Sequence, residues 1–176
     1  MNLNLVKKHI IQWLKSSLDE SGAKGFVVGV SGGIDSALTS TLAASTGAPL
    51  LVINIPINQE SGQYSRSNIQ IDWLKKRFPN NVESRIVDLT SVYNTYTDTV
   101  KGLTDLAMAN AASRLRMTAL YSYANSKNYL VVGTGNKVED YGVGFFTKYG
   151  DGGVDISPIA DLLKSEVYDL SRQLEI

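Results

Sequence analysis

The sequence contains no cysteine, one histidine and only four prolines among its 176 residues. Without cysteine, the chain has no disulfide bonds, thiolate metal ligands or cysteine nucleophiles. It also has no excess charge of one sign, because 17 basic and 17 acidic side chains give a formal net charge of zero. Proteins that bind nucleic acids or membrane surfaces usually carry a cationic excess, so we expect neither kind of partner.

Long hydrophobic runs are missing as well. No stretch approaches the ~20 consecutive apolar residues of a membrane-spanning helix. The N-terminal segment around Val6–Ile11 mixes charged and apolar residues and does not form the apolar core of a signal peptide. We therefore expect a cytoplasmic protein, and the chain is long enough for one domain with a sizeable core.

The pattern of apolar residues predicts strands that alternate with helices. The expected strands are residues 25–30, 50–55, 86–87 and 129–132. The expected helices are residues 6–18, 34–46, a segment around 69–74 that ends before Pro79, 103–125 and 161–174. Strands that are apolar on successive residues are typical of a parallel sheet covered on both faces. The sequence thus predicts an α/β fold with a doubly wound, Rossmann-like parallel sheet, formed by a single domain over residues 1–176.

Ligands of such folds bind at the carboxyl ends of the strands. Two polar segments, 31–36 and 133–140, follow predicted strands, so the site is expected between them. Tyr64 and Arg66, expected in the loop after the second strand, are candidates to line the nucleotide site; the alternative is an ordinary loop.

The first of these segments combines glycines, hydroxyls and a carboxylate. Glycines between a strand and a helix let backbone amides approach phosphate oxygens closely. Ser31 and Ser36 add hydroxyl donors, whereas Asp35 would repel phosphate unless a divalent cation lies between them. No lysine stands where a Walker A loop requires one. The alternative is a tight turn with a serine helix cap.

Residues 133–158 form a glycine-rich segment that is too long for a simple connection. It contains Glu139, Lys148, Asp151 and Asp155, a mixture that suits a polar, multiply charged ligand together with a metal ion. The alternative is a solvated surface loop.

Three stretches carry a resemblance to known enzymes. Ser-Gly-Gly-Ile-Asp-Ser at 31–36 resembles the pyrophosphate-binding loop of the ATP pyrophosphatases. Phe-Phe-Thr-Lys-Tyr-Gly-Asp-Gly-Gly at 145–153 resembles the signature of NAD synthetases, and Ala112–Met117 is similar to their substrate-binding helix. The resemblance covers about residues 24–174 and implies an adenine nucleotide alpha hydrolase-like fold.

This resemblance implies a ligase that adenylates the nicotinate carboxylate of deamido-NAD with ATP and amidates it with ammonia, giving NAD, AMP and pyrophosphate. It assigns ATP binding to Gly29, Val30, Ser31, Gly32, Gly33, Ile34, Asp35, Ser36, Thr134 and Lys164. It assigns Mg²⁺ to Asp35 and Glu139, catalysis to Asp35 and Lys164, and deamido-NAD to Arg114, Lys148 and Asp155. The alternatives are a surface salt bridge for Arg114 and a solvated first-turn position for Lys164.

The resemblance also implies a homodimer. The helix from Leu106 to Tyr123 is apolar around most of its circumference, which fits burial against a second copy; the alternative is burial within one chain. Some family members make ammonia from glutamine in a fused domain with a cysteine nucleophile. Because this chain has no cysteine, free ammonia or a separate glutaminase is the expected source.

The chain stops at Gln173–Ile176 inside a helical pattern, and similar enzymes continue further. We therefore expect a domain truncated at its C-terminus that binds ATP weakly and makes little NAD.

Two other functions remain as alternatives. One is another synthetase with the same phosphate loop, such as a tRNA-thiolating or GMP-forming enzyme, although a thiolating enzyme would show cysteines or a basic face. The other is a non-catalytic ATP-binding module, which has no need of Asp35, Glu139 and Lys148 together.

Overall fold

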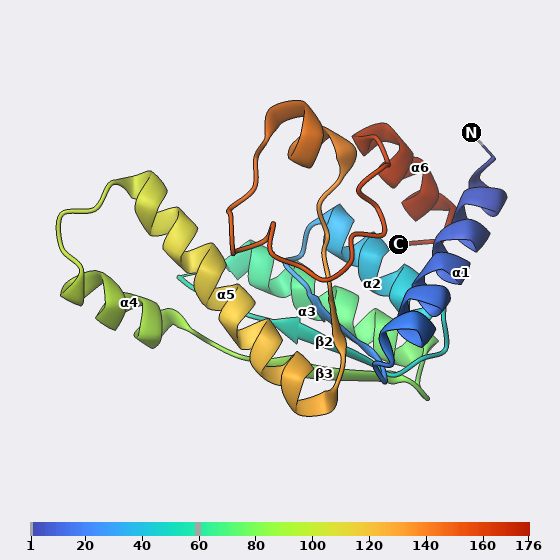
Figure 1. Cartoon of the computed structure of the whole chain (residues 1–176), viewed down its shortest axis with the longest axis horizontal. Helices are drawn as coiled ribbons and strands as arrows, with labels where there is room; N and C mark the ends of the chain where they lie inside the picture. The colour runs from blue at the N-terminus through green and yellow to red at the C-terminus, as the bar shows by residue number, and fades with distance from the viewer. Residues whose placement is uncertain (1, 59–60) are drawn as a thin grey trace.

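A parallel sheet of four strands forms the centre of the computed structural model, which describes residues 2–58 and 61–176. The strands lie in the order β3 (Val82–Ile86), β2 (Leu50–Asn54), β1 (Phe26–Gly29) and β4 (Leu130–Val132). The chain therefore builds the sheet outward from β1 to β3 and then crosses back to place β4 on the other side of β1 (Figure 1). This confirms the predicted Rossmann-like sheet.

The register of the strands brings two polar segments together. Val28 of β1 pairs with Val52 of β2 on one side and with Val132 of β4 on the other. The segments that follow β1 and β4 consequently leave the same edge of the sheet. The point where the strand order reverses lies between them, and this is where ligands bind in open α/β sheets.

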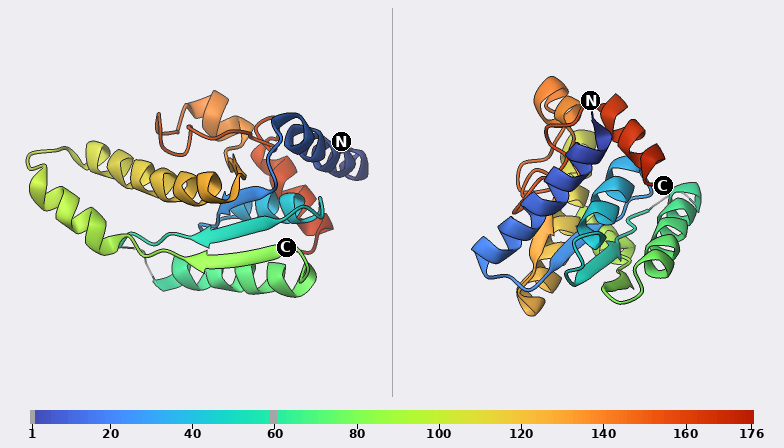
Figure 2. Two further views of the ribbon diagram at one scale, coloured as in Figure 1. Left: turned by 60° about the horizontal axis from the view of Figure 1, so that its bottom comes forward. Right: turned by 90° about the vertical axis from the view of Figure 1, so that its right-hand side faces the viewer.

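Helices cover both faces of the sheet, as the apolar strands require. Helices α1 (Leu3–Ser21), α2 (Ile34–Ala44), α3 (Ser61–Arg77) and α6 (Lys164–Gln173) contribute to one core with the sheet. Helix α5 (Asp105–Lys127) packs on the opposite face, so α3 and α5 lie on opposite sides of the strands (Figure 2).

Alternate residues of the strands supply the two cores. Phe26 and Val28 face α2 and α3, whereas Val27 packs with Met117 and Leu120 of α5. Helix α2 is buried over Ser36–Ala44 because the sheet and its neighbouring helices cover it on all sides. The first turn of α2, which follows the glycine-rich loop after β1, is thus continuous with a buried helix.

Several predicted boundaries are wrong. The third strand was expected at 86–87, but β3 covers Val82–Ile86, where three of five side chains are polar and its apolar signal is weak. Helix α4 (Thr90–Thr99) was not predicted, although Val92, Tyr93 and Tyr96 lie at helical spacing; none of its residues is buried. The last helix begins at Lys164 and not at residue 161.

Two local expectations also change. The segment 133–158 contains a short π-helix, η1 (Val138–Val143), which sequence periodicity did not indicate. Arg66 lies within α3 and not in a loop. Among the described residues, none of the helices combines the length and apolarity needed to cross a bilayer.

Candidate functional site

The loop between β1 and α2 forms a cradle of backbone amides. Gly32 has a φ of 82°, a left-handed conformation that favours glycine. The Ser36 hydroxyl donates to the Gly33 carbonyl at 2.9 Å, and the Gly33 amide donates to the Ser31 hydroxyl at 3.3 Å. Because these contacts fix the loop at the N-terminus of α2, its amides and the helix dipole favour an anion such as phosphate.

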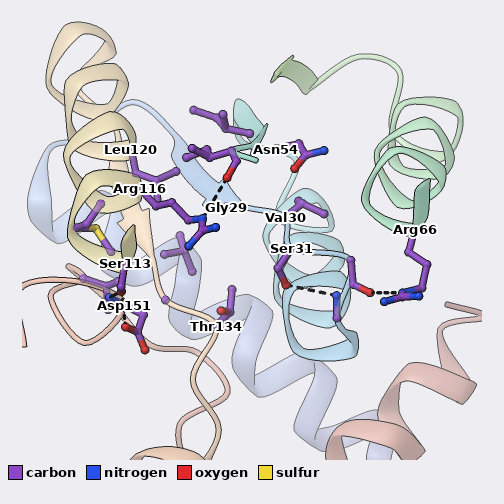
Figure 3. A pocket seen from close by; sticks show the side chains of 18 residues that line it. Gly29, Val30, Ser31, Asn54, Arg66, Ser113, Arg116, Leu120, Thr134 and Asp151 are labelled. Carbon is purple, nitrogen blue, oxygen red and sulfur yellow. Dashed lines mark hydrogen bonds between the residues drawn. The ribbon is translucent and has the colours of Figure 1, made fainter. Parts of the chain in front are cut away.

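A pocket of about 480 Å³ opens beside this loop (Figure 3). Its walls are the loop, the end of β2, one face of α5 and the segment after β4. The lining includes Gly29, Val30, Ser31, Gly32, Gly33, Asn54, Arg66, Ser113, Arg116, Leu120, Thr134 and Asp151. The volume and the mixture of apolar walls with a few polar groups are typical of a small-molecule site.

Two arginines border the pocket: Arg66, which the sequence offered as a candidate, and Arg116, which it did not single out. The Nε of Arg116, on α5, donates to the Ile55 carbonyl at 3.1 Å, and the Nε of Arg66, on α3, donates to the Gly32 carbonyl at 3.4 Å (Figure 3). Burial lowers the pKa of Arg116, partly offset by Tyr93, yet an arginine keeps its charge in proteins. The two cations make the pocket suitable for a polyanion.

Asp35, Glu139 and Lys164 meet next to the phosphate loop, although they come from α2, η1 and α6. The Lys164 ammonium donates to one Asp35 carboxylate oxygen and, at 3.1 Å, to the Glu139 Oε1. Burial alone would lower the pKa of Lys164, but the hydrogen bonds and charges of Asp35 and Glu139 outweigh it and raise the pKa. The solvated first-turn position is therefore not what the structure shows for this lysine.

These two carboxylates fit a magnesium ion. Residues 2–58 and 61–176 contain no group of three or more His, Cys, Asp or Glu side chains that would hold a metal alone. Mg²⁺ usually takes one or two protein carboxylates and completes its shell with water and substrate phosphates. The donors present, beside an amide cradle for phosphate, match that chemistry.

Asn136 is a member of this cluster that sequence reasoning missed. Its side chain is fully buried, and its Nδ2 donates to the Asp35 Oδ1 at 2.9 Å. Its Oδ1 accepts from the amides of Val138 and Glu139 at 3.0 and 3.2 Å. The available signal was an asparagine shortly before a helical turn, a frequent capping position.

The three residues predicted to bind deamido-NAD come from different parts of the chain: Arg114 from α5, Lys148 from the loop that α5 contacts, and Asp155 from beside β4, where its Oδ2 accepts from the Val131 amide at 2.8 Å. The Arg114 Nε donates to the Lys148 carbonyl at 3.1 Å, and the salt bridges among residues 2–58 and 61–176 do not include Arg114. The Lys148 ammonium lies 5.0 Å from the centre of the Tyr149 ring. Asp155 accepts from the Tyr121 hydroxyl at 2.8 Å. Tyr121 and Tyr149 line a second hollow.

The segment 147–151 is attached directly to α5 and connects the two hollows. The Ser113 hydroxyl donates to the Asp151 Oδ1 at 2.6 Å, and the Thr147 hydroxyl donates to the Asn110 Oδ1 at 2.8 Å. A Cβ at Gly150 would lie 2.3 Å from the Ser113 Oγ, so only glycine permits this close approach.

Comparison with known proteins identifies relatives along the whole chain. Residues 6–176 match the family model described as NAD synthase. The chain is 37% identical over 183 residues to the NH(3)-dependent NAD(+) synthetase of Methanosarcina acetivorans, covering 100% of this chain and 69% of that protein. It is 41% identical over 175 residues to the protein of the same name from Mycoplasmopsis pulmonis, covering 97% of this chain and 66% of that protein.

Solved structures agree with these relatives. The structure of NMN synthetase from Francisella tularensis superposes with a TM-score of 0.92 at 34% identity, covering 100% of this chain and 72% of that one. The NH3-dependent NAD synthetase from Campylobacter jejuni, in complex with the nitrate ion, gives 0.91 at 30% identity, covering 100% and 75%.

Proposed function

Since the chain belongs to the NAD synthase family, we propose that it uses ATP and ammonia to convert the nicotinate carboxylate of deamido-NAD into the amide of NAD. One observation carries the proposal beyond family membership. Asp35, Glu139 and Lys164 converge from three separate elements beside an amide cradle. A non-catalytic ATP-binding module would need the cradle but not this cluster.

The first step activates the carboxylate. An oxygen of the nicotinate carboxylate attacks the α-phosphorus of ATP, the bond to the bridging oxygen breaks, and pyrophosphate leaves. The loop 29–36 and the N-terminus of α2 would hold the leaving phosphates through backbone amides. Lys164 would move from the carboxylates to the phosphate oxygens, since its ammonium already lies at the edge of the loop.

Asp35 and Glu139 would hold Mg²⁺, and Thr134 would contact ATP from the pocket wall. When bound, magnesium neutralises charge on the phosphate oxygens and orients them. Arg66 and Arg116 add positive charge at the pocket border. The result is a site that stabilises the charge of the departing pyrophosphate.

Ammonia completes the reaction. Its nitrogen attacks the carbonyl carbon of the acyl adenylate, the bond to the AMP oxygen breaks, and a proton is lost to give the amide and AMP. We propose that Arg114, Lys148 and Asp155 bind deamido-NAD, supported by the contacts of Asp155 with Tyr121 and of Lys148 with Tyr149, two tyrosines that line the second hollow. Free ammonia or a separate glutaminase would supply the nitrogen, and the use of ATP favours a cytoplasmic location.

A second candidate substrate is nicotinate mononucleotide. It is favoured by the likeness to the Francisella tularensis NMN synthetase, at 34% identity and a TM-score of 0.92. The amidated group is the same nicotinate carboxylate, and the two substrates differ only in the adenylate half. The contacts at the second hollow would decide between them.

The test is product identification by mass spectrometry after incubation with ATP, Mg²⁺, ammonia and either dinucleotide or mononucleotide. We expect NAD and AMP in equal amounts, and formation of both should stop when ammonia or Mg²⁺ is omitted. Preferential formation of NMN would favour the second substrate. ADP in place of AMP, or AMP formed without any NAD or NMN, would contradict the proposed activity.

A further inference from the structure

We propose that Asn136 is a positioning residue that sets the relative orientation of Asp35 and Glu139 for a divalent cation. The inference rests on the proposed metal site. It begins from the fact that one fully buried side chain touches both the Asp35 carboxylate and the backbone of Glu139.

The donor half of the amide restrains Asp35. This carboxylate lies in the first turn of α2, with a side chain only 15% exposed. The Asn136 Nδ2 donates to its Oδ1, whereas Lys164 contacts its Oδ2. The hydrogen bond from Asn136 therefore fixes the rotation of the carboxylate and leaves the other oxygen directed toward the position where the ammonium now lies.

The acceptor half restrains Glu139. The Asn136 Oδ1 accepts from the backbone amides of Val138 and Glu139, which begin the turn of η1. The neighbouring Lys137 amide donates to the Leu162 carbonyl, two residues before Lys164. The turn that presents Glu139 is thus tied both to Asn136 and to the segment that leads into α6.

An amide is suited to this double role. Asparagine donates through nitrogen and accepts through oxygen at the same time, and it adds no charge next to two carboxylates. An aspartate would keep the acceptor but face Asp35 with a second negative charge. Residues that orient metal ligands in this way typically contribute about 10–100-fold to metal affinity.

The experiment measures Mn²⁺ binding by electron paramagnetic resonance, with a non-cleavable α,β-methylene analogue of ATP present. The variants are Asn136→Ala and the nearly isosteric Asn136→Leu. The matched control is Asn81→Ala, because the Asn81 side chain donates to the Ala44 and Ala48 carbonyls near the opposite edge of the sheet. Melting temperatures of all variants separate a loss of stability from a loss of metal binding.

We expect Mn²⁺ affinity to fall about 10-fold or more in both Asn136 variants. It should stay unchanged in Asn81→Ala, even if that variant loses as much in melting temperature as the Asn136 variants do. Affinity within twofold of the unaltered chain in a folded Asn136 variant would overturn the inference. Asp35→Asn provides the separate check on the proposed site. If it too binds Mn²⁺ normally, the metal site itself is wrong.

A second measurement needs no substitution. In the unaltered chain, Mg²⁺ and the same analogue should shift the side-chain amide resonance of Asn136 in ¹⁵N NMR, because its hydrogen-bond partner becomes a metal ligand. An unshifted resonance at saturating Mg²⁺ would contradict the inference even if both variants failed to fold.

Discussion

The Asp35 carboxylate receives hydrogen bonds from Asn136 and Lys164, so its geometry is held by residues from two other segments. Asp35→Asn keeps the size of the side chain but removes the negative charge. We expect the rate of AMP formation to fall about 100-fold or more. Mutating residues that only orient metal ligands already lowers metal affinity or activity about 10–100-fold, and Asp35 is a proposed ligand itself. Circular dichroism should show an intact fold. Asp169→Asn, which affects an exposed ion pair with Arg172, serves as the control and should keep full activity.

Lys148 gives a prediction about substrate discrimination. We propose that it binds deamido-NAD; its ammonium lies 5.0 Å from the centre of the Tyr149 ring and its carbonyl accepts from Arg114. Loss of one hydrogen bond to a charged group costs about 1.5–3 kcal/mol, so Lys148→Ala should weaken deamido-NAD binding roughly 10–100-fold. The affinity for ATP, measured by calorimetric titration, should change little. Equal losses for both ligands would refute the assignment, and Lys127→Ala, another lysine near a tyrosine ring, is the matched control.

The ionisation of Asp140 makes the stability of the folded protein depend on pH. Burial raises its pKa above the ordinary value of 3.8, and the charges of Glu139 and Asp151 raise it further. Ionisation of Asp140 therefore lowers the free energy of unfolding. The loss is complete at pH values above the raised pKa and absent at pH values below 3.8. Asp140→Asn should raise the melting temperature at pH 7, with a gain that disappears as the pH falls toward 3.8. A gain that is independent of pH would contradict this explanation.

The segment 147–151 shows how one element is docked on another. A Cβ at Gly150 would clash with Ser113 of α5 at 2.3 Å, whereas a Cβ at Gly142 of η1 would meet only atoms at 3.8 Å or more. Gly150→Ala should cost about 1–3 kcal/mol in the free energy of unfolding, the usual range for overpacking. Gly142→Ala should be close to neutral in denaturant titration. Equal stability of the two variants would show that the segment moves freely on α5.

The elements themselves could be predicted where burial leaves a strong pattern. Strand β1 and helix α2 were predictable from the sequence because nearly all their residues are apolar or small and buried. Strand β3 was predicted only at its end, since three of its five side chains are polar, and helix α4 was missed although Val92, Tyr93 and Tyr96 lie at helical spacing. A period of 3.6 residues also cannot reveal a π-helix such as η1.

The residues of the site were predictable only in part, because their positions depend on how the elements pack together. Residues two apart on a helix point in different directions, so Arg114 and Arg116 could not both face the pocket. Which of the two does depends on the docking of α5, and the structure places Arg116 there. Asn136 acts through tertiary contacts with residue 35, which no local pattern encodes.

At the scale of the whole molecule, we expect a twofold dimer. Helix α4 and the start of α5 project from the body (Figure 1), α4 has no buried residue, and Leu106 is 71% exposed. A second copy packed on this arm would cover these apolar groups. Light scattering at micromolar concentration should give twice the chain mass of 19.1 kDa. Leu106→Glu should lower that mass to one chain without unfolding it.

A single-chain mass for the unaltered protein would contradict the dimer. The same result for Leu106→Glu and for a control on an exposed site elsewhere, such as Leu5→Glu, would show that the arm is not the contact.

If the carboxylate attacks the α-phosphorus of ATP, one of its oxygens must end in AMP. The decisive substrate is deamido-NAD that carries ¹⁸O in both carboxylate oxygens. Adenylation followed by ammonia attack leaves one ¹⁸O in the amide of NAD and transfers the other to AMP. We therefore predict one ¹⁸O in each molecule of AMP by mass spectrometry. Unlabelled AMP, or ¹⁸O in inorganic phosphate together with ADP, would exclude attack of the carboxylate on the α-phosphorus.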